Sequence, residues 1–135
     1  MTVDSDGGGE GKVGPFSQML GFRLVEALPE QVVLEAVPRP EHLNGGGIVH
    51  GGYLTSLLDS ASGWAVHMRL PDRARAPHTH LSVQYVRAAV GGERLVCTGR
   101  CVRAGRRVAS AEAEIVQGGK VIARAVTTHA ILGLD

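Results

Sequence analysis

The sequence has no long hydrophobic run and no excess of charge of one sign. No apolar stretch reaches the roughly 18 residues that a membrane-spanning helix requires, and the polar, glycine-rich amino terminus is unlike a signal peptide. The 14 basic residues nearly balance the 13 acidic ones, so charge gives no general reason to expect binding to nucleic acid or to an anionic membrane. We therefore expect a cytoplasmic protein that binds neither.

Motifs for disulfides, metals and nucleotides are also missing. Cys97 and Cys101 stand four residues apart in a strand-like stretch, where their side chains would lie about 13 Å apart, beyond disulfide reach. We expect both to be small buried apolar residues. The histidines show no metal-ligand spacing, and the sequence contains no G-x-S-x-G elbow, phosphate-binding loop or dinucleotide fingerprint. The sequence predicts no metal site.

The chain length allows one domain. Its 135 residues can form one real hydrophobic core and are too few for two. Residues 1–14, MTVDSDGGGEGKVG, are polar and rich in glycine and have almost nothing to bury, so we expect a disordered tail. The folded domain is expected to span residues 15–135.

The expected elements follow the order strand, strand, long apolar helix and four strands. After a short helical turn at 15–20, strands are expected at 22–27 and 31–37, and a loop at 39–50 leads into a helix that ends before Pro71. The four later strands, separated by glycine turns, are typical of an antiparallel meander; they are expected at 79–87, 94–103, 107–116 and 120–132.

The strand at 107–116 shows which face is buried. Small apolar residues alternate with polar ones there, and the inner positions are Ala109, Ala111, Ala113 and Ile115. These small side chains leave room for a helix against the sheet. The sequence therefore predicts an α+β fold in which a curved antiparallel sheet wraps around one long central α-helix.

Asp59 is the only residue between Gly51 and Val66 on that helix whose side chain is charged at neutral pH. We expect the helix to be buried all round, and a buried carboxylate is costly unless it is paired or used. A stripe of small residues surrounds Asp59 at helical spacing: Thr55, Ser56, Ser62 and Gly63. Asp59 is therefore either a buried acid satisfied by Thr55 or Ser56, or the centre of a functional site.

The residues Asn44, His50, Gly51, Gly52 and Asp59 fall at a spacing that resembles the hotdog-fold acyl-CoA thioesterases of the PaaI type, with a likeness that extends over residues 15–132. The resemblance implies hydrolysis of an acyl- or aryl-CoA thioester to a carboxylate and CoA. Because CoA is then part of the substrate, no cofactor is expected. The resemblance also implies a homodimer with the acyl-CoA across its interface, and pairing of two dimers into a tetramer.

The chemistry of this motif can be derived from its residues. A helix N-terminus offers unpaired N–H groups that can stabilise an oxyanion, and Gly51 leaves the approach open. A carboxylate can deprotonate water or attack directly. At ~1.5 Å per residue, however, Asp59 lies about 12 Å from Gly51 along the helix, so one helix cannot place both groups on one carbonyl. The simplest solution is two antiparallel subunits, with Gly51 of one facing Asp59 of the other.

The other two motif residues each allow two roles. His50 holds the loop by hydrogen bonds or transfers a proton. Asn44 caps the glycine-rich turn or, as the resemblance implies, positions the thioester or the water. We count both residues with Asp59 and Gly51 as candidate catalytic residues.

Further residues are expected to contact the substrate. Some relatives carry a Ser or Thr that assists the water where this chain has His78, followed by Thr79, and others carry a Thr where this chain has Gly63. Arg103, Arg106 and Arg107 flank a turn and either hold the CoA phosphates or form a solvated turn. The expected substrate-binding residues are Gly52, Ser62, Gly63, His78, Thr79, Arg103, Arg106 and Arg107.

Two alternatives to a thioesterase remain open. The same fold could bind an acyl-CoA without chemistry, or act as a hydratase or dehydratase, although hotdog hydratases pair a histidine with an acid differently. The acyl group is also open, because aromatic residues make up only 4% of the chain and the pocket walls would come from both subunits. An arylacetyl, a benzoyl or a medium-chain fatty acyl group would each be compatible.

Overall fold

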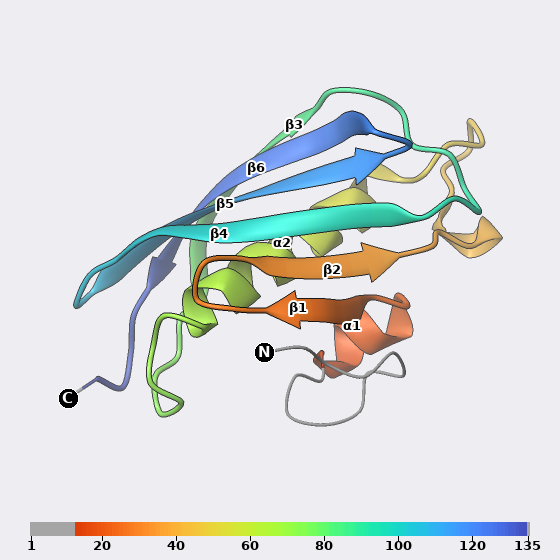
Figure 1. The fold of residues 1–135 in the computed structure, drawn as a ribbon. Helices are drawn as coiled ribbons and strands as arrows, with labels where there is room; N and C mark the ends of the chain where they lie inside the picture. The colour runs from red at the N-terminus through yellow and green to blue at the C-terminus, as the bar shows by residue number, and fades with distance from the viewer. Residues whose placement is uncertain (1–12, 135) are drawn as a thin grey trace.

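A six-stranded antiparallel sheet wraps around the long helix α2 (Gly51–His67) in the computed structural model of the chain, which describes residues 13–134 (Figure 1). The sheet order is β1-β2-β4-β5-β6-β3. The strands are β1 (Arg23–Ala27), β2 (Val32–Ala36), β3 (His78–Tyr85), β4 (Leu95–Ala104), β5 (Val108–Gln117) and β6 (Lys120–Ala130). A short helix α1 (Pro15–Met19) precedes β1, and a 3-10 turn (Pro40–His42) lies in the loop before α2. The predicted α+β arrangement is confirmed.

The position of β3 differs from the predicted meander. Strands β4, β5 and β6 do follow one another as antiparallel neighbours, but β3 pairs with β6 at the far edge of the sheet. The connection from β3 to β4 crosses the end of the sheet, where Val86 N–H donates to Ile122 O and Gly92 N–H donates to Pro38 O. The prediction that β3 neighbours β4 was wrong because glycine turns show where strands end and do not show which strands pair.

The core lies between α2 and the sheet. The helix buries Leu54, Leu57, Leu58, Ala61 and Ala65. The same cluster contains Cys97, Ala113 and Ile115. A second cluster joins Val66 of α2 to Cys101, Ala109 and Ala111. The predicted inner residues of β5 and both free cysteines are thus buried, as expected.

The helix approaches the sheet most closely at Gly99 on β4. A Cβ atom there would collide with the carbonyl group of Ala61. Glycine is therefore required at this strand position by packing, and the backbone of α2 rests directly on β4.

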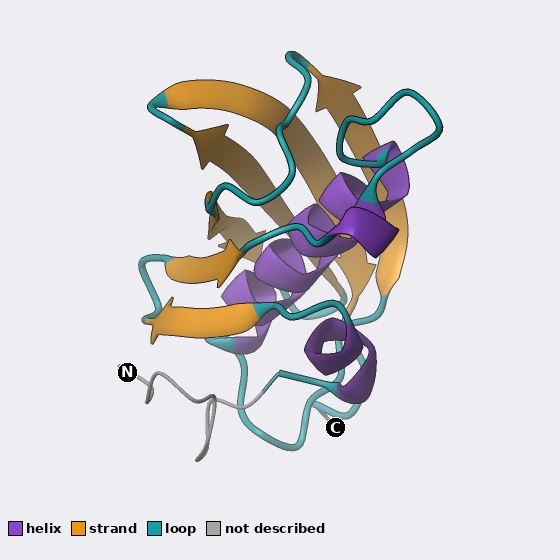
Figure 2. Cartoon of the chain, turned by 90° about the vertical axis from the view of Figure 1, so that its right-hand side faces the viewer, coloured by secondary structure: helices purple, strands orange, loops and turns teal. Residues whose placement is uncertain are grey.

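The expectation that α2 is buried all round was wrong. The side chain of Asp59 is 53% exposed, and Thr55, Ser56 and Ser60 beside it are only partly buried. Figure 2 shows that the sheet covers one side of α2 and that no strand covers the other. The short helix α1 approaches this face, where the hydroxyls of Ser17 and Ser60 are 2.7 Å apart. An apolar sequence made this helix look buried, but Thr55, Ser56, Asp59 and Ser60 share the uncovered side, whereas Ser62 is buried.

The described chain begins in the core. Val13 is buried, and its carbonyl accepts a hydrogen bond of 2.6 Å from Nε2 of Gln18. Val13, which was expected to belong to the tail, therefore packs in the fold, and the rest of the expected tail, residues 1–12, lies outside the described residues. No helix between residues 13 and 134 is long and apolar enough to cross a membrane.

Candidate active site

The N-terminus of α2 is held by His50. The Nδ1 atom of His50 accepts a hydrogen bond of 2.8 Å from Gly52 N–H, and the His50 carbonyl accepts from Tyr53 N–H. The backbone N–H of His50 donates to the carbonyl of His42. His50 is thus an N-cap that fixes the loop to the helix, which is the first of its two expected roles. Because His50 accepts the hydrogen bond of Gly52 N–H, that group is not available to a ligand. The N–H of Gly51 has no hydrogen-bond partner among residues 13–134.

Asn44 shapes the glycine-rich turn. Its side-chain oxygen accepts from Gly46 N–H at 2.9 Å and from Ile48 N–H at 3.3 Å. In this structure Asn44 therefore caps the glycine-rich turn, which is one of the two roles expected for it. Because Asn44 and Gly51 line the same pocket, this cap also sets the shape of the space in front of the free N–H.

The pocket beside Gly51 has a volume of about 270 Å³ and is closed on one side by Tyr85 from the end of β3. The Tyr85 hydroxyl donates to the carbonyl of Gly51 at 3.1 Å and shares a short hydrogen bond with the hydroxyl of Thr55. A Cβ atom on Gly51 would lie 3.2 Å from the tyrosine ring. No role for Tyr85 was predicted from the sequence, since an exposed aromatic residue at a strand end carries no distinctive spacing.

The Asp59 side chain lines a different pocket. Its carboxylate borders a space of about 460 Å³ between α1 and α2, which is also lined by Phe16, Ser17 and Ser60. Neither of the partners proposed for a buried acid bonds to it, because Ser56 donates to the carbonyl of Gly52 and Thr55 pairs with Tyr85. Asp59 and Gly51 therefore lie on one helix but face separate pockets of one chain.

His78, at the start of β3, lies beside the Asp59 carboxylate. The distance from Nδ1 of His78 to Oδ2 of Asp59 is 3.6 Å, and Nε2 lies 3.0 Å from the hydroxyl of Ser62. Gly63 faces the same ring, since a Cβ added there would lie 3.4 Å from His78 Cε1. Three of the expected substrate-binding residues thus surround Asp59: His78, Ser62 and Gly63. Ser62 is fully buried, so it contacts His78 and is not accessible to a substrate.

Thr79 does not join this cluster. Its hydroxyl lies 3.2 Å from that of Thr128 on β6. The sequence position next to His78 suggested a shared role, but the Thr79 side chain pairs along the sheet instead.

The ring of a buried histidine, His129 on β6, packs against the ring of His78. The two ring centroids are 4.1 Å apart. Nδ1 of His129 lies 3.1 Å from the carbonyl of Ala76, and its Nε2 lies 2.8 Å from the hydroxyl of Thr127. Burial lowers the pKa of His129 and outweighs the hydrogen bond to the Ala76 carbonyl, which raises it. His129 is therefore neutral near pH 7. No pattern in the sequence predicted a role for His129.

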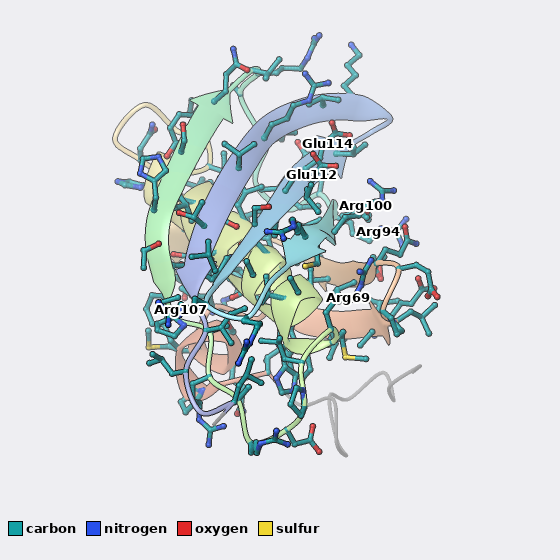
Figure 3. All side chains as sticks on the ribbon, turned by 90° about the vertical axis from the view of Figure 1, so that its left-hand side faces the viewer. Arg69, Arg94, Arg100, Arg107, Glu112 and Glu114 are labelled. Atoms are coloured by element: carbon teal, nitrogen blue, oxygen red, sulfur yellow. The ribbon has the colours of Figure 1, made fainter. Side chains whose placement is uncertain are left out.

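The three arginines expected to bind CoA phosphates lie at the β4–β5 turn. Arg103, Arg106 and Arg107 are exposed, and none forms an ion pair with an acidic side chain in the described part of the chain. Arg106 and Arg107 line a pocket of about 520 Å³ with residues 131–134. Figure 3 places Arg107 at the opposite end of β5 from Glu114. The structure does not bring these arginines into the pockets of Asp59 or Gly51. Within residues 13–134, no three His, Cys, Asp or Glu side chains gather as metal ligands.

Comparison with known proteins assigns the family. The model of the thioesterase superfamily matches residues 46–123, more than half of the chain. Mouse acyl-coenzyme A thioesterase 13 is 31% identical over 84% of this chain and 82% of its own length. The chain belongs to the thioesterase superfamily.

Solved structures agree with the fold. A mutant of the phenylacetic acid degradation protein PaaI from Thermus thermophilus has a TM-score of 0.80 and 31% identity, covering 87% of this chain and 98% of that one. A Streptococcus mutans protein bound to acetyl CoA has a TM-score of 0.77 and 25% identity, covering 84% of this chain and 90% of that one. These similarities confirm the predicted hotdog fold and the resemblance to PaaI proteins.

Proposed function

We propose that this protein hydrolyses an acyl-CoA thioester to a carboxylate and free CoA. The observation that carries the proposal is the Asp59 carboxylate, which opens into a pocket on an otherwise apolar helix of a thioesterase-superfamily chain. Asp59 either takes a proton from the attacking water or attacks the thioester carbon itself. In both routes the carbonyl oxygen becomes negatively charged, and the N–H of Gly51 at the positive end of α2 stabilises it.

A second copy of the chain is part of this proposal, because Asp59 and Gly51 face separate pockets. Strand β3 supplies the link between them. Its first residue, His78, contacts Asp59, and its last residue, Tyr85, contacts Gly51. β3 is also an edge strand, since it pairs only with β6 among the described strands, and an edge strand is a template for pairing with another chain.

Antiparallel pairing of two β3 strands would unite the two groups. When the pairing is centred on the middle of the strand, His78 of one copy lies opposite Tyr85 of the partner subunit. Asp59 of one copy then approaches Gly51 of the partner subunit, and the twofold symmetry gives two identical sites. We propose this homodimer as the active unit, and pairing of two such dimers as the tetramer.

The remaining residues have supporting roles in the proposal. Asn44 and His50 hold the turn that presents Gly51 N–H. Arg103, Arg106 and Arg107 bind the CoA phosphates, which is supported by their exposure and by the lack of an ion pair with any acidic side chain within residues 13–134. The Streptococcus mutans relative bound to acetyl CoA supports an acyl-CoA as the substrate.

Thiol release from a panel of acyl-CoA substrates tests this function. The panel contains arylacetyl-, benzoyl- and medium-chain acyl-CoA, and free CoA is measured with a thiol reagent. Asp59→Asn is expected to keep the fold and the affinity for CoA, measured by calorimetry, but to lower turnover by about 10² or more. Glu112→Gln, an exposed acid on the outer face of the sheet, is the matched control and should leave turnover unchanged.

Two results would contradict the proposal. A wild-type protein that releases no thiol from any member of the panel is not a thioesterase for these substrates, and CoA binding without release would indicate a binding module. Near-normal turnover by Asp59→Asn would exclude the chemical role of this carboxylate.

A further inference from the structure

The His78 imidazole is held in one orientation by Ser62. The Ser62 hydroxyl is buried and has a single proton to donate. It donates within α2, to the backbone carbonyl of Leu58 at 2.8 Å, and the backbone carbonyl of Asp59 lies 3.1 Å away. With the hydroxyl proton directed to these carbonyls, its oxygen accepts from the imidazole, and this hydrogen-bond arrangement assigns the hydrogen of the neutral His78 ring to Nε2. In the neutral ring this leaves Nδ1 without a hydrogen, facing Asp59.

Nδ1 is consequently the atom of His78 that gains and loses a proton. It lies 3.6 Å from Oδ2 of Asp59, a distance longer than a direct hydrogen bond and within the range of an ion pair. His78 is 19% exposed and Asp59 is 53% exposed at the side chain. The carboxylate therefore has one side toward the pocket and one side toward the imidazole.

The other groups around His78 do not compete for this proton. β3 packs against β6 and α2. The titratable group facing the ring from β6 is His129, which burial keeps neutral, and the one facing it from α2 is Asp59. In its neutral form, His129 adds no positive charge that would oppose protonation of His78.

Given the thioesterase activity proposed above, we propose that His78 is a positioning residue that accepts, at Nδ1, the proton that Asp59 takes from the attacking water. The water oxygen forms a bond to the thioester carbon as its proton passes to Asp59 and then to His78. When the C–S bond breaks, the thiolate of CoA leaves with the electron pair and takes the proton back through Asp59. The products are the acid and CoA, and no other reactant is needed.

This assignment favours the general-base route for Asp59. An imidazole nitrogen is intrinsically a stronger base than a carboxylate oxygen, so a proton taken up by Asp59 passes favourably to Nδ1 of His78. A direct nucleophilic attack by Asp59 would gain nothing from a protonatable neighbour.

Two substitutions of His78 separate proton transfer from packing. His78→Asn places an amide where Nδ1 lies, and His78→Gln keeps a donor near Ser62, but neither amide can titrate. Both are expected to lower kcat by roughly 10- to 100-fold with KM nearly unchanged. The pH profile of kcat should also differ between the wild type and both variants, whereas a merely structural role of His78 would leave the shape of the profile unchanged. His67→Asn, at an exposed position at the end of α2 and outside the proposed β3 interface, is the matched control.

The outcomes distinguish this inference from the proposed function. An inactive wild-type protein contradicts the thioesterase function itself and overturns the relay with it. An active wild type whose His78→Asn variant keeps its kcat and its pH profile overturns the relay alone, and Asp59→Asn then still tests the function. If a variant fails to fold, ring-labelled histidine NMR of the wild type decides: His78 should carry its hydrogen on Nε2 when neutral, and a neutral ring protonated on Nδ1 would overturn the proposal.

Discussion

The hydroxyl of Tyr85, the last residue of the edge strand β3, donates a hydrogen bond of 3.1 Å to the carbonyl of Gly51, the first residue of α2. The same hydroxyl bonds to Thr55 one turn along the helix. This contact fixes the end of β3 to the N-terminus of α2, so any partner that pairs with β3 is held in a defined position relative to Gly51 N–H.

Removal of this hydroxyl should loosen the junction. Tyr85→Phe keeps the ring beside Gly51 but loses both hydrogen bonds, and we expect the free energy of unfolding to fall by about 1 kcal/mol. Urea denaturation measures this change. Thr55→Val and the double variant complete a cycle, in which the two substitutions should be less than additive because they share one hydrogen bond. An additive cycle would mean that the Tyr85–Thr55 contact contributes nothing.

Complementation should reveal whether each site uses two chains. Asp59→Asn removes the carboxylate, and Gly51→Pro deletes the N–H at a first helical position where proline is tolerated. His50 already has the extended backbone that precedes proline, with ψ 137°. After the two inactive variants are unfolded together and refolded, activity should return to about one quarter of the wild type, since half of random dimers are mixed and each has one intact site.

The control for this experiment is Gly51→Ala. Alanine also brings a Cβ near the Tyr85 ring but keeps the N–H, so it should retain far more activity than Gly51→Pro. If mixed dimers form and no activity returns, the site does not combine Asp59 of one chain with Gly51 of the other.

Stability should decrease in mild acid because of two buried histidines. Burial lowers the pKa of His129 and of His42, and for His42 the neighbouring Arg39 lowers it further. Both side chains are neutral in the fold and take up protons more readily when unfolded. The unfolded chain therefore binds more protons as the pH falls below about 6.5, and the free energy of unfolding should drop by up to about 1.4 kcal/mol per pH unit for each histidine.

Denaturation by urea at several pH values between 5 and 8 measures this slope. His129→Gln should make the slope shallower, whatever its effect on stability at pH 8. His80→Gln, at an exposed position, serves as the control. An unchanged slope in His129→Gln would show that His129 does not contribute to the acid sensitivity.

The close approach of α2 to the sheet predicts that Gly99 does not tolerate a side chain. Gly99→Ala would push a methyl group against the Ala61 carbonyl, and we expect a loss of about 2 kcal/mol in the free energy of unfolding. Gly14→Ala is the control, because nothing lies within 4 Å of a Cβ placed there. Equal stability of the two variants would mean that α2 can move away from β4 at little cost.

Local patterns in the sequence determined most of the elements. Alternating small and polar residues predict β5 correctly, and the apolar run after the His-Gly-Gly turn predicts α2. Both patterns arise from the periodicity of strands and helices, which depends on neighbours a few residues away. The spacing of Asn44, His50, Gly51 and Asp59 was sufficient to indicate the family for the same reason, since all four belong to one continuous segment.

Tertiary structure alone decided which side of α2 is open and what surrounds Asp59. The uncovered face depends on where the sheet ends, and β3 lies at the edge because it pairs with β6, forty residues later in the chain. His78 therefore reaches Asp59 from a different element, and Ser62 and His129 orient it through contacts that no spacing in the sequence reports. Such contacts join residues that are distant along the chain, and they exist only once the sheet has closed around the helix.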